Sequence, residues 1–356
     1  MNHDEILAWL HEQDADRLEG LWHRANTIRR EHVGDSVHIR GLIEFSNVCR
    51  SNCHYCGMRA GRPSLPRYRM SGREILASAR KAVEHGYGTV VMQSGEDPGL
   101  DVEWLAGIVE RIRRETALTV TLSCGERSRD ELARWRDSGA DRYFLRFETS
   151  DRALWKRIHP RQAGGAHRLD MLGWIKDLGY EIGSGIMIGI PGQTLASLAE
   201  DIEWFQRLDL DMIGSGPFVP HAETPLGRAH LSSGSAGILD QVPNTELMTY
   251  KVMALTRVVC PRVNMPSTTA LATLNREHGS ELGLRRGANV LMVNLTPAGY
   301  RALYEIYPEK ADSSVLPAAQ REKVAALLGG LGRFAGSGPG SSPNYRDRQE
   351  KVASRG

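Results

Sequence analysis

The chain has 356 residues, of which 41% are hydrophobic and 25% are charged, an ordinary composition for a globular protein with a sizeable core. Its formal net charge is only +2, so no field of one sign indicates nucleic acid or a membrane surface as a partner. No apolar stretch approaches the roughly 18 residues of a membrane span, and no signal peptide is recognisable, so we expect a cytoplasmic protein.

Short apolar strands and longer amphipathic helices alternate after a helical N-terminal extension, residues 1–36. The expected strands are residues 38–46, 89–94, 118–123, 142–148, 181–190, 212–219, 264–269 and 289–293. The expected helices are residues 74–85, 102–114, 128–138, 166–178, 195–208, 245–259, 281–286 and 318–328. Strict alternation implies parallel strands that are joined by right-handed crossovers.

The strand–helix units within residues 37–334 favour an α/β fold, a complete (β/α)8 TIM-type barrel, since such barrels take roughly 250 residues. The main alternative is an open, six-stranded partial barrel with a C-terminal extension. Residues 335–356 are rich in Gly, Ser, Pro and charged side chains, and we expect them to form a disordered tail.

A cysteine cluster follows the first expected strand. Cys49, Cys53 and Cys56 have the spacing C-x3-C-x2-C, and such a cluster without a secretion signal indicates metal binding in a reducing compartment. Thiolates select soft metals or iron–sulfur clusters. Three thiolates would leave one iron of a four-iron cluster without a protein ligand, and an open position of this kind can bind an external ligand.

Other metal centres need a fourth ligand. A zinc knuckle could use only His54, which lies between two of the cysteines and would reach the same ion awkwardly. A ferredoxin-type cluster would need a nearby cysteine, whereas Cys124 and Cys260 are far away in the sequence. Zinc binding, electron transfer and a chance group of buried thiols remain the alternatives.

Polar residues recur where the expected strands end, which is the active face of a barrel of this kind. Gly95 would let the backbone approach a ligand, and Glu96 could complement an ammonium group. Arg146 and Glu148 share one face of the fourth strand, because side chains alternate with period two. A plain β–α turn at the first place and a structural Arg–Glu pair at the second are the alternatives.

Further polar residues allow a structural and a functional interpretation. Thr194 is a good helix cap, and we expect His221 to be a solvated loop histidine. Thr268 and Thr269 could hydrogen-bond a small polar substrate, or serve only strand formation and helix capping. Three tyrosines after the last strand have the spacing of one helical face, for which packing is the usual reason: Tyr300, Tyr304 and Tyr307.

The cysteine spacing, with the aromatic Tyr55 before the third cysteine, resembles the radical S-adenosylmethionine (SAM) superfamily. The resemblance implies one 4Fe–4S cluster whose open iron binds the amine and carboxylate of SAM. One electron from an external donor then cleaves SAM to a 5′-deoxyadenosyl radical. Glu148 would accept bonds from the ribose, and Arg168 would lie near the SAM carboxylate. The SAM contacts that the resemblance implies are Tyr55, Ser94, Gly95, Glu96, Glu148, Arg168, Met187 and Met212.

Further motifs between Gly41 and Leu331 resemble the HydE family of FeFe-hydrogenase maturases, whose relatives include biotin synthase and methylornithine synthase. They are Glu-Phe-Ser-Asn-Val-Cys at 44–49, Gln-Ser-Gly-Glu-Asp-Pro at 93–98, Asp-Arg-Tyr-x-x-Arg-x-Glu-Thr at 141–149, Pro-Gly-Gln-Thr at 191–194, Gly-Pro-Phe-x-Pro-His at 216–221 and Gly-Ala-Asn-Val at 287–290.

This second resemblance implies an internal cavity below SAM and a small organometallic substrate. That substrate would be a cysteine-bound iron carbonyl cyanide, supplied by a partner maturase for the di-iron subcluster of the H-cluster. Transient contact with other hydrogenase maturases is implied as well. Arg146, Tyr304 and Tyr307 would act as catalytic residues. The residues that would line the substrate cavity are Gln93, Arg146, Thr268, Thr269, Tyr304 and Tyr307.

Two features depart from the family pattern. Residues 311–331 contain no cysteine, although some members bind an accessory 2Fe–2S cluster there, so we expect only one cluster. Phe147 stands where the family usually has His, and this difference weakens the assignment of the substrate. The alternative function is therefore a radical SAM mutase or synthase with a small amino-acid-like substrate, of the methylornithine synthase or biotin synthase type. A non-enzymatic iron–sulfur or zinc protein is the third hypothesis.

Overall fold

The computed structural model describes residues 1–160, 167–233, 240–310 and 317–354. Its main sheet is parallel and runs in the order β9-β1-β2-β3-β4-β5-β7. These strands are β1 (Ser36–Ser46), β2 (Thr89–Ser94), β3 (Thr119–Ser123), β4 (Arg142–Phe144), β5 (Glu181–Ser184), β7 (Met212–Ile213) and β9 (Val290–Asn294). The protein therefore has an α/β fold with a parallel half-barrel sheet of seven strands.

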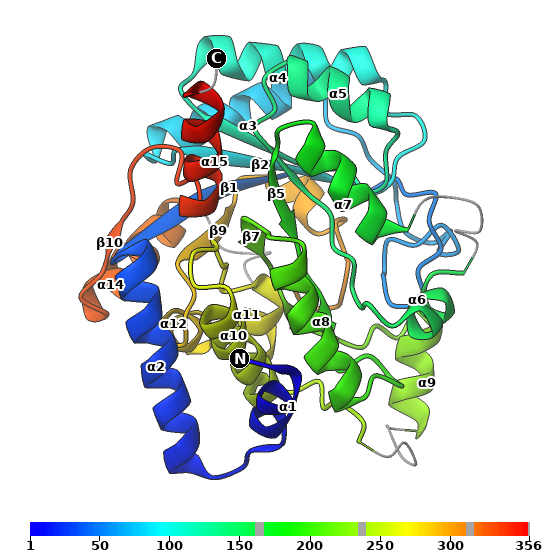
Figure 1. Ribbon diagram of the computed structural model, residues 1–356. Coiled ribbons are helices and arrows are strands. Elements are labelled where there is room, and N and C mark those ends of the chain that lie inside the picture. The colour runs from blue at the N-terminus through cyan, green and yellow to red at the C-terminus, as the bar shows by residue number, and fades with distance from the viewer. Residues whose placement is uncertain (161–166, 234–239, 311–316, 355–356) are drawn as a thin grey trace.

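Helices cover the outer face of this sheet (Figure 1). The helices of the described residues are α1 (His3–His11), α2 (Ala15–Val33), α3 (Gly72–Glu84), α4 (Val102–Glu115), α5 (Arg129–Asp137), α6 (Arg152–Ile158), α7 (Arg168–Asp177), α8 (Leu195–Arg207), α9 (Pro225–Ser233), α10 (Glu246–Val259), α11 (Thr269–Leu274), α12 (Gly279–Arg285), α13 (Ala298–Arg301), α14 (Pro317–Gly330) and α15 (Pro343–Ala353). Ser71 and Ser128 start α3 and α5 with capping boxes, in which a Glu three residues later bonds back to the serine amide.

The complete eight-stranded barrel expected above is not established by these strands. In place of the expected strand 264–269, the structure has single parallel bridges from Asn264 to Met212 and from Pro266 to Val290. Pro266 has no amide proton to donate to a ladder, and Thr268 already caps α11 two residues later. The segment is therefore too short and too poor in donors to form a regular strand.

Two expected strands are interrupted. The fifth continues after Gly185 as β6 (Met187–Ile188), and the sixth continues as β8 (Gly216–Pro217). These continuations pair with each other and not with the main sheet. At Gly185 an added Cβ would lie 1.9 Å from Gly214 O, so the two backbones cross too closely for any side chain.

The C-terminal segment differs from the expected disordered tail. Strand β10 (Phe334–Ala335) pairs with the start of β1, and the following residues run beneath the main sheet to α15. Arg142 Nη2 and Thr89 Oγ1 donate to Pro339 O, at 2.7 and 3.0 Å. A Cβ at Gly88 would lie 1.7 Å from Gly338 O. Gly88, just before β2, therefore lets the C-terminal segment approach closely, and a composition typical of disorder was misleading.

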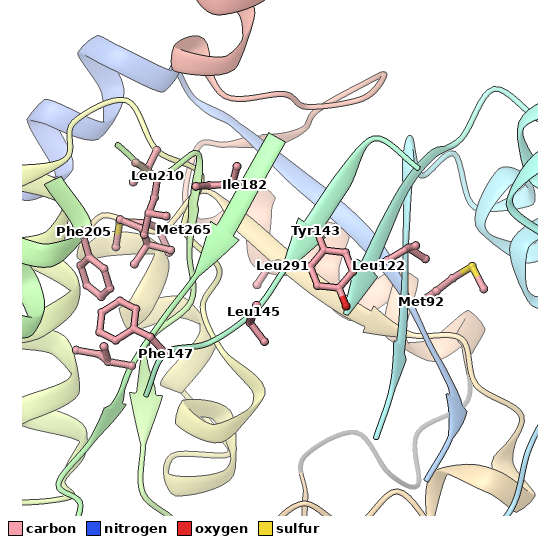
Figure 2. Close-up of a cluster of buried hydrophobic side chains, with 14 of the residues drawn as sticks. Met92, Leu122, Tyr143, Leu145, Phe147, Ile182, Phe205, Leu210, Met265 and Leu291 are labelled. Carbon is pink, nitrogen blue, oxygen red and sulfur yellow. The ribbon is translucent and has the colours of Figure 1, made fainter. Parts of the chain in front are cut away.

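The core lies between the sheet and its helices, as Figure 2 shows for side chains from several strands. Met92, Leu122 and Tyr143 come from three neighbouring strands and are buried. Phe147 follows β4 and packs on Phe205 of α8, with ring centroids 5.7 Å apart. Among the described residues, no helix has the length and apolar character needed to cross a membrane.

Candidate active site

The cysteine loop leaves the end of β1 and lies against the turn that follows β2. Gly95 N donates to Ser46 O at 3.0 Å. A Cβ atom at Gly95 would lie 2.3 Å from Val48 O and 2.8 Å from Cys49 Cβ, so only glycine fits at this point. The turn at Gly95, which the sequence singled out, therefore touches the first cysteine.

Each of the three loop thiols is hard to ionise in this environment. Burial, followed by the neighbouring Cys49, raises the pKa of Cys56 to about 12. Burial also raises the pKa of Cys53 well above its ordinary value, although Arg168 acts in the opposite direction. Cysteine binds metals as the thiolate, and a metal supplies the positive charge that a buried thiolate needs. The loop is therefore suited to a cationic inorganic group.

Within the described residues, no group of three or more Cys, His, Asp or Glu side chains is arranged to hold one metal ion. All five cysteines are free thiols.

A buried group of charges lies beside the cysteine loop. Glu96 accepts a hydrogen bond from Ser51 Oγ (2.5 Å) and lies 3.4 Å from Arg168 Nη2. Arg168 also donates to Glu126 Oε1 (2.8 Å) and to Arg146 O (2.8 Å). Burial raises the pKa of Glu126, partly offset by Arg168. The sequence-predicted Glu96 and Arg168 are thus in contact, and Glu126 is a member of the group that sequence reasoning missed.

Glu148 lies close to Arg146 and Tyr55. Its Oε1 is 3.3 Å from Tyr55 Oη, and its Oε2 is 3.2 Å from Arg146 Nε. The second contact lacks hydrogen-bond geometry, so this buried oxygen has no hydrogen-bond partner among the described residues. Glu148 has φ +66°, a left-handed conformation that is uncommon for residues with a side chain.

Tyr55 has a second neighbour that the sequence did not indicate. Its hydroxyl lies 3.0 Å from His159 Nε2, and His159 Nδ1 donates to Trp155 O at 3.1 Å. Burial, followed by Arg168, lowers the pKa of His159 well below its ordinary value. A neutral His159 that donates through Nδ1 must accept through Nε2, so the single Tyr55 proton is shared between His159 and Glu148.

A buried ion pair joins the end of β1 to the segment after β9. Lys310 Nζ donates to Glu44 Oε1 (2.5 Å), and Asn294 Nδ2 donates to Glu44 Oε2 (3.0 Å). Lys310 Nζ also lies 5.0 Å from the centre of the Tyr304 ring. Glu44 lies in a largely buried strand, which is unusual for a carboxylate, whereas nothing in the sequence pointed to Lys310.

The remaining cofactor candidates lie at different levels of the sheet. Ser94 is buried beside Gly95, and its hydroxyl donates to Gly95 O (2.8 Å). Met187, on β6, belongs to an apolar cluster that Tyr55 packs against. Met212 instead lies at the start of β7, where its sulfur is 2.9 Å from Arg40 Nη1. This contact with β1 does not join Met212 to the other cofactor candidates.

The substrate candidates come from the ends of several strands. Gln93 is in register with Glu44 of β1, so the two share a face of the sheet. Thr268 caps α11, and Thr269 begins that helix. Tyr304 is 1% exposed, and its hydroxyl has no hydrogen-bond partner among the described residues. Tyr307 is half buried.

The prediction that three tyrosines after the last strand share one helical face was wrong. Tyr300, Tyr304 and Tyr307 do not share one helix, because α13 ends at Arg301. Tyr300 instead stacks on Tyr68, with ring centroids 4.6 Å apart. The three tyrosines therefore have separate surroundings, and only Tyr304 and Tyr307 remain substrate candidates.

The expectation of a solvated His221 was also wrong, since this side chain is buried. Its Nε2 lies 3.1 Å from both Glu305 Oε1 and Arg62 Nη1. Gly57 N, in the cysteine loop, donates to Ile306 O at 2.8 Å. His221 therefore belongs to a polar group that holds the cysteine loop against residues 305–306.

Comparison with known proteins agrees with this geometry. Residues 43–205 match the Radical SAM superfamily. Over 316 residues the chain is 43% identical to the FeFe hydrogenase maturase subunit HydE of Thermotoga maritima, and the match covers 87% of this chain and 86% of that protein. This chain belongs to the HydE family of radical SAM enzymes.

Solved structures support the fold of this HydE-family chain. Methylornithine synthase (PylB) superposes with a TM-score of 0.77 at 22% identity and covers 94% of both chains. HydG, a maturase of the FeFe-hydrogenase, gives a TM-score of 0.78 at 17% identity over 99% of this chain and 77% of that chain. At these identities the likeness concerns the fold alone.

Proposed function

We propose that this enzyme cleaves SAM reductively and acts on a small precursor of the di-iron subcluster of the FeFe-hydrogenase active site. The observation that carries the proposal is the cysteine loop beside buried Glu96, Arg168 and Glu148, in a chain that is 43% identical to HydE over 87% of its length. The implied substrate is an organometallic complex, a cysteine-bound iron carbonyl cyanide. Another maturase would supply this complex, so we propose a transient contact between that maturase and this enzyme.

Cys49, Cys53 and Cys56 would hold one 4Fe–4S cluster through three of its irons. When bound and reduced by an external donor, the cluster supplies the electron that cleaves the sulfonium of SAM. Glu96 is held by Ser51 and Arg168 and would accept from the SAM ammonium group. We expect no accessory 2Fe–2S cluster, since residues 311–331 contain no cysteine.

Glu148 would bind the ribose of SAM. Its Oε2 is buried and lies 3.2 Å from Arg146 Nε, but it accepts no hydrogen bond within the described part of the chain, so it is free to accept one from a ligand. A ribose hydroxyl is a donor of the required kind. Tyr55 would keep the other carboxylate oxygen in place.

The substrate would bind on the inner side of the sheet, below SAM. We propose that the bridges at Asn264 and Pro266 complete the eighth position of a closed barrel around it. The orphaned Tyr304 hydroxyl supports its role as a substrate contact. Substrate contacts are further proposed for Gln93, Arg146, Thr268, Thr269 and Tyr307, with Arg146, Tyr304 and Tyr307 as catalytic residues.

The test uses anaerobically reconstituted, dithionite-reduced protein. Its EPR spectrum is recorded with and without SAM, and 5′-deoxyadenosine is assayed with and without the iron carbonyl cyanide–cysteine complex. A SAM-shifted signal and a change in SAM consumption caused by the complex are expected. A SAM-shifted signal that is indifferent to the complex would favour a mutase or synthase with an amino-acid-like substrate. No effect of SAM at all would overturn the proposal.

A further inference from the structure

Asp201 is a completely buried carboxylate on the outer helix α8. No Lys, Arg or His of the described residues forms an ion pair with it, in contrast to the buried Glu44 and Glu181. A buried carboxylate without a cation is unfavourable unless several hydrogen-bond donors satisfy it. The structural role of Asp201 therefore follows from the groups that donate hydrogen bonds to it.

One oxygen of Asp201 holds the turn that follows Glu148. Oδ1 accepts from Ser150 N (2.5 Å), from Ser150 Oγ (2.6 Å) and from Thr149 Oγ1 (3.3 Å). Glu148 itself is in the left-handed conformation, which persists only where the surroundings determine it. Three hydrogen bonds to the next two residues provide that constraint.

The other oxygen of Asp201 acts through Gln193. Oδ2 accepts from Gln193 Nε2 (3.2 Å), which also donates to Met187 O (3.2 Å). Gln193 Oε1 accepts from Gly189 N (2.8 Å) and Ile190 N (3.3 Å). Every polar atom of the buried Gln193 amide is thus used to hold the turn after β6.

The two turns are also joined to each other. Met187 N donates to Glu148 O at 3.0 Å, so a shift of one backbone moves the other. Helix α8 packs directly on this region through Phe205, which faces Phe147 in Figure 2. One carboxylate therefore connects the helix to both Glu148 and Met187 without reaching either side chain.

We propose that Asp201 is a positioning residue for the adenosine half of SAM. It fixes the backbone of Glu148 and, through Gln193, that of Met187, so that both side chains meet the nucleoside in one arrangement. The inference rests on the proposed function, which assigns these two residues to SAM.

Asp201→Asn tests the hydrogen-bond pattern with almost no change in shape. The new Nδ2 would face Gln193 Nε2, and two donors cannot bond to each other. If Gln193 rotated to offer its oxygen, its Nε2 would meet the amides of Gly189 and Ile190. We expect the Kd for SAM to rise about tenfold, with iron content unchanged. Amide hydrogen exchange should become faster at residues 149–151 and 187–190, in protein without SAM.

A second substitution should restore part of the pattern. In Asp201→Asn/Gln193→Glu, the amide introduced at position 201 donates to the carboxylate introduced at position 193. The other oxygen of that carboxylate can accept from Gly189 N and Ile190 N, but no donor remains for Met187 O. SAM affinity should therefore recover only part of the loss seen in Asp201→Asn. Gln193→Glu alone places two carboxylates against each other and should weaken binding at least as much as Asp201→Asn.

Asp211→Asn is the matched control. Asp211 is also fully buried and accepts from Ile182 N (2.9 Å), but it pairs with Arg348 and lies at the opposite end of the sheet. Its loss should lower the melting temperature and leave the Kd for SAM within about twofold. If Asp201→Asn does not fold, Ser150→Ala removes one of the same bonds and should weaken SAM binding about threefold.

The outcomes separate this inference from the proposed function. Wild-type SAM affinity and unchanged exchange in Asp201→Asn, or in Ser150→Ala if the former does not fold, would overturn the role of Asp201. Equal losses of affinity in the Asp201 and Asp211 variants would do so too, because they would reflect general destabilisation. Wild-type protein that fails to bind SAM would instead overturn the proposed function, and this inference with it.

Discussion

Arg142 and Glu181 form an ion pair at the base of the sheet, and both side chains are closed to solvent. The C-terminal segment completes their hydrogen bonds. Arg142 Nη2 donates to Pro339 O (2.7 Å) and lies 3.1 Å from Ser341 Oγ, while Ser342 N donates to Glu181 Oε1 (2.8 Å). The pair therefore attaches the end of the chain to β4 and β5.

Arg142→Met should destabilise the fold strongly. It leaves Glu181 buried without its cation, which costs about 3–5 kcal/mol in the free energy of unfolding. Arg142→Met/Glu181→Met removes both charges and should be less destabilised than Arg142→Met alone. Urea unfolding of the wild type, Arg142→Met, Glu181→Met and the double variant measures this. A double variant as unstable as the sum of the two single variants would show that the pair is not coupled.

Stability should also depend on pH through His38, whose ring lies against the same segment. An added Cβ at Gly336 or Gly340 would be 2.6 Å from the ring, so the contact is close. Burial, followed by Arg40 and Arg142, lowers the pKa of His38 to about 4. The unfolded chain therefore binds a proton as the pH falls below about 6.5, and the folded chain does not.

The stability from a neutral His38 is thus complete above about pH 6.5 and is lost as the pH falls towards about 4, by at most about 1.4 kcal/mol per pH unit. His38→Gln should remove this part of the slope. The measurement compares unfolding free energies of the variant and the wild type at about pH 7 and about pH 5. Parallel pH dependence in both proteins would contradict the assignment.

The alternation of strands and helices could be predicted because buried parallel strands and amphipathic helices leave different periods in the sequence. Strand β2 has the expected bounds, 89–94. The irregular elements could not be predicted, because they depend on contacts between segments that are far apart in the sequence. Gly185 and Gly214 interrupt two strands by the contact of one backbone with another. Gly336 and Gly340 pack against His38 under the sheet, although the same composition is typical of disorder.

The candidate site shows the same division. The spacing of the cysteines and the turn at Gly95 are local patterns, so the sequence revealed them. Lys310 meets Glu44 only through the fold, since 266 positions separate them. Asp201 reads in the sequence as one more polar position of an amphipathic helix, and only its burial distinguishes it.

Tyr304→Phe should separate substrate binding from stability. The hydroxyl is buried without a hydrogen-bond partner among the described residues, so its removal should leave the melting temperature equal or slightly higher. If the hydroxyl contacts the substrate, SAM cleavage without substrate should be unchanged, and the response to the iron carbonyl cyanide–cysteine complex should fall about tenfold. A clear loss of stability would indicate a structural role for the hydroxyl instead.

Cys53→Ala should abolish both the cluster and SAM cleavage, because Cys53 is one of only three proposed ligands. Iron and sulfide content, EPR and 5′-deoxyadenosine formation provide the readouts. Cys260→Ala is the matched control, since Cys260 is buried at the end of α10 and away from the loop. Full cleavage activity in Cys53→Ala, or an equal loss in Cys260→Ala, would refute the proposed ligand set.

Glu148→Gln should weaken SAM binding while the cluster is retained. The substitution keeps the size of the side chain but removes its charge, and a neutral amide accepts a weaker bond from the ribose. Loss of one charge-assisted hydrogen bond of about 1.5 kcal/mol corresponds to a roughly tenfold higher Kd. Titration of the reconstituted protein with SAM measures this, and iron analysis confirms the cluster.

Glu110→Gln provides the comparison for this last variant. Glu110 also pairs with an arginine, Arg134, but on the exposed face of α4, where a surface ion pair contributes at most about 1 kcal/mol. Its Kd for SAM should equal that of the wild type. Unchanged affinity in Glu148→Gln would remove Glu148 from the site, whereas an equal rise of Kd in Glu110→Gln would show that the effect comes from the loss of a negative charge anywhere on the protein.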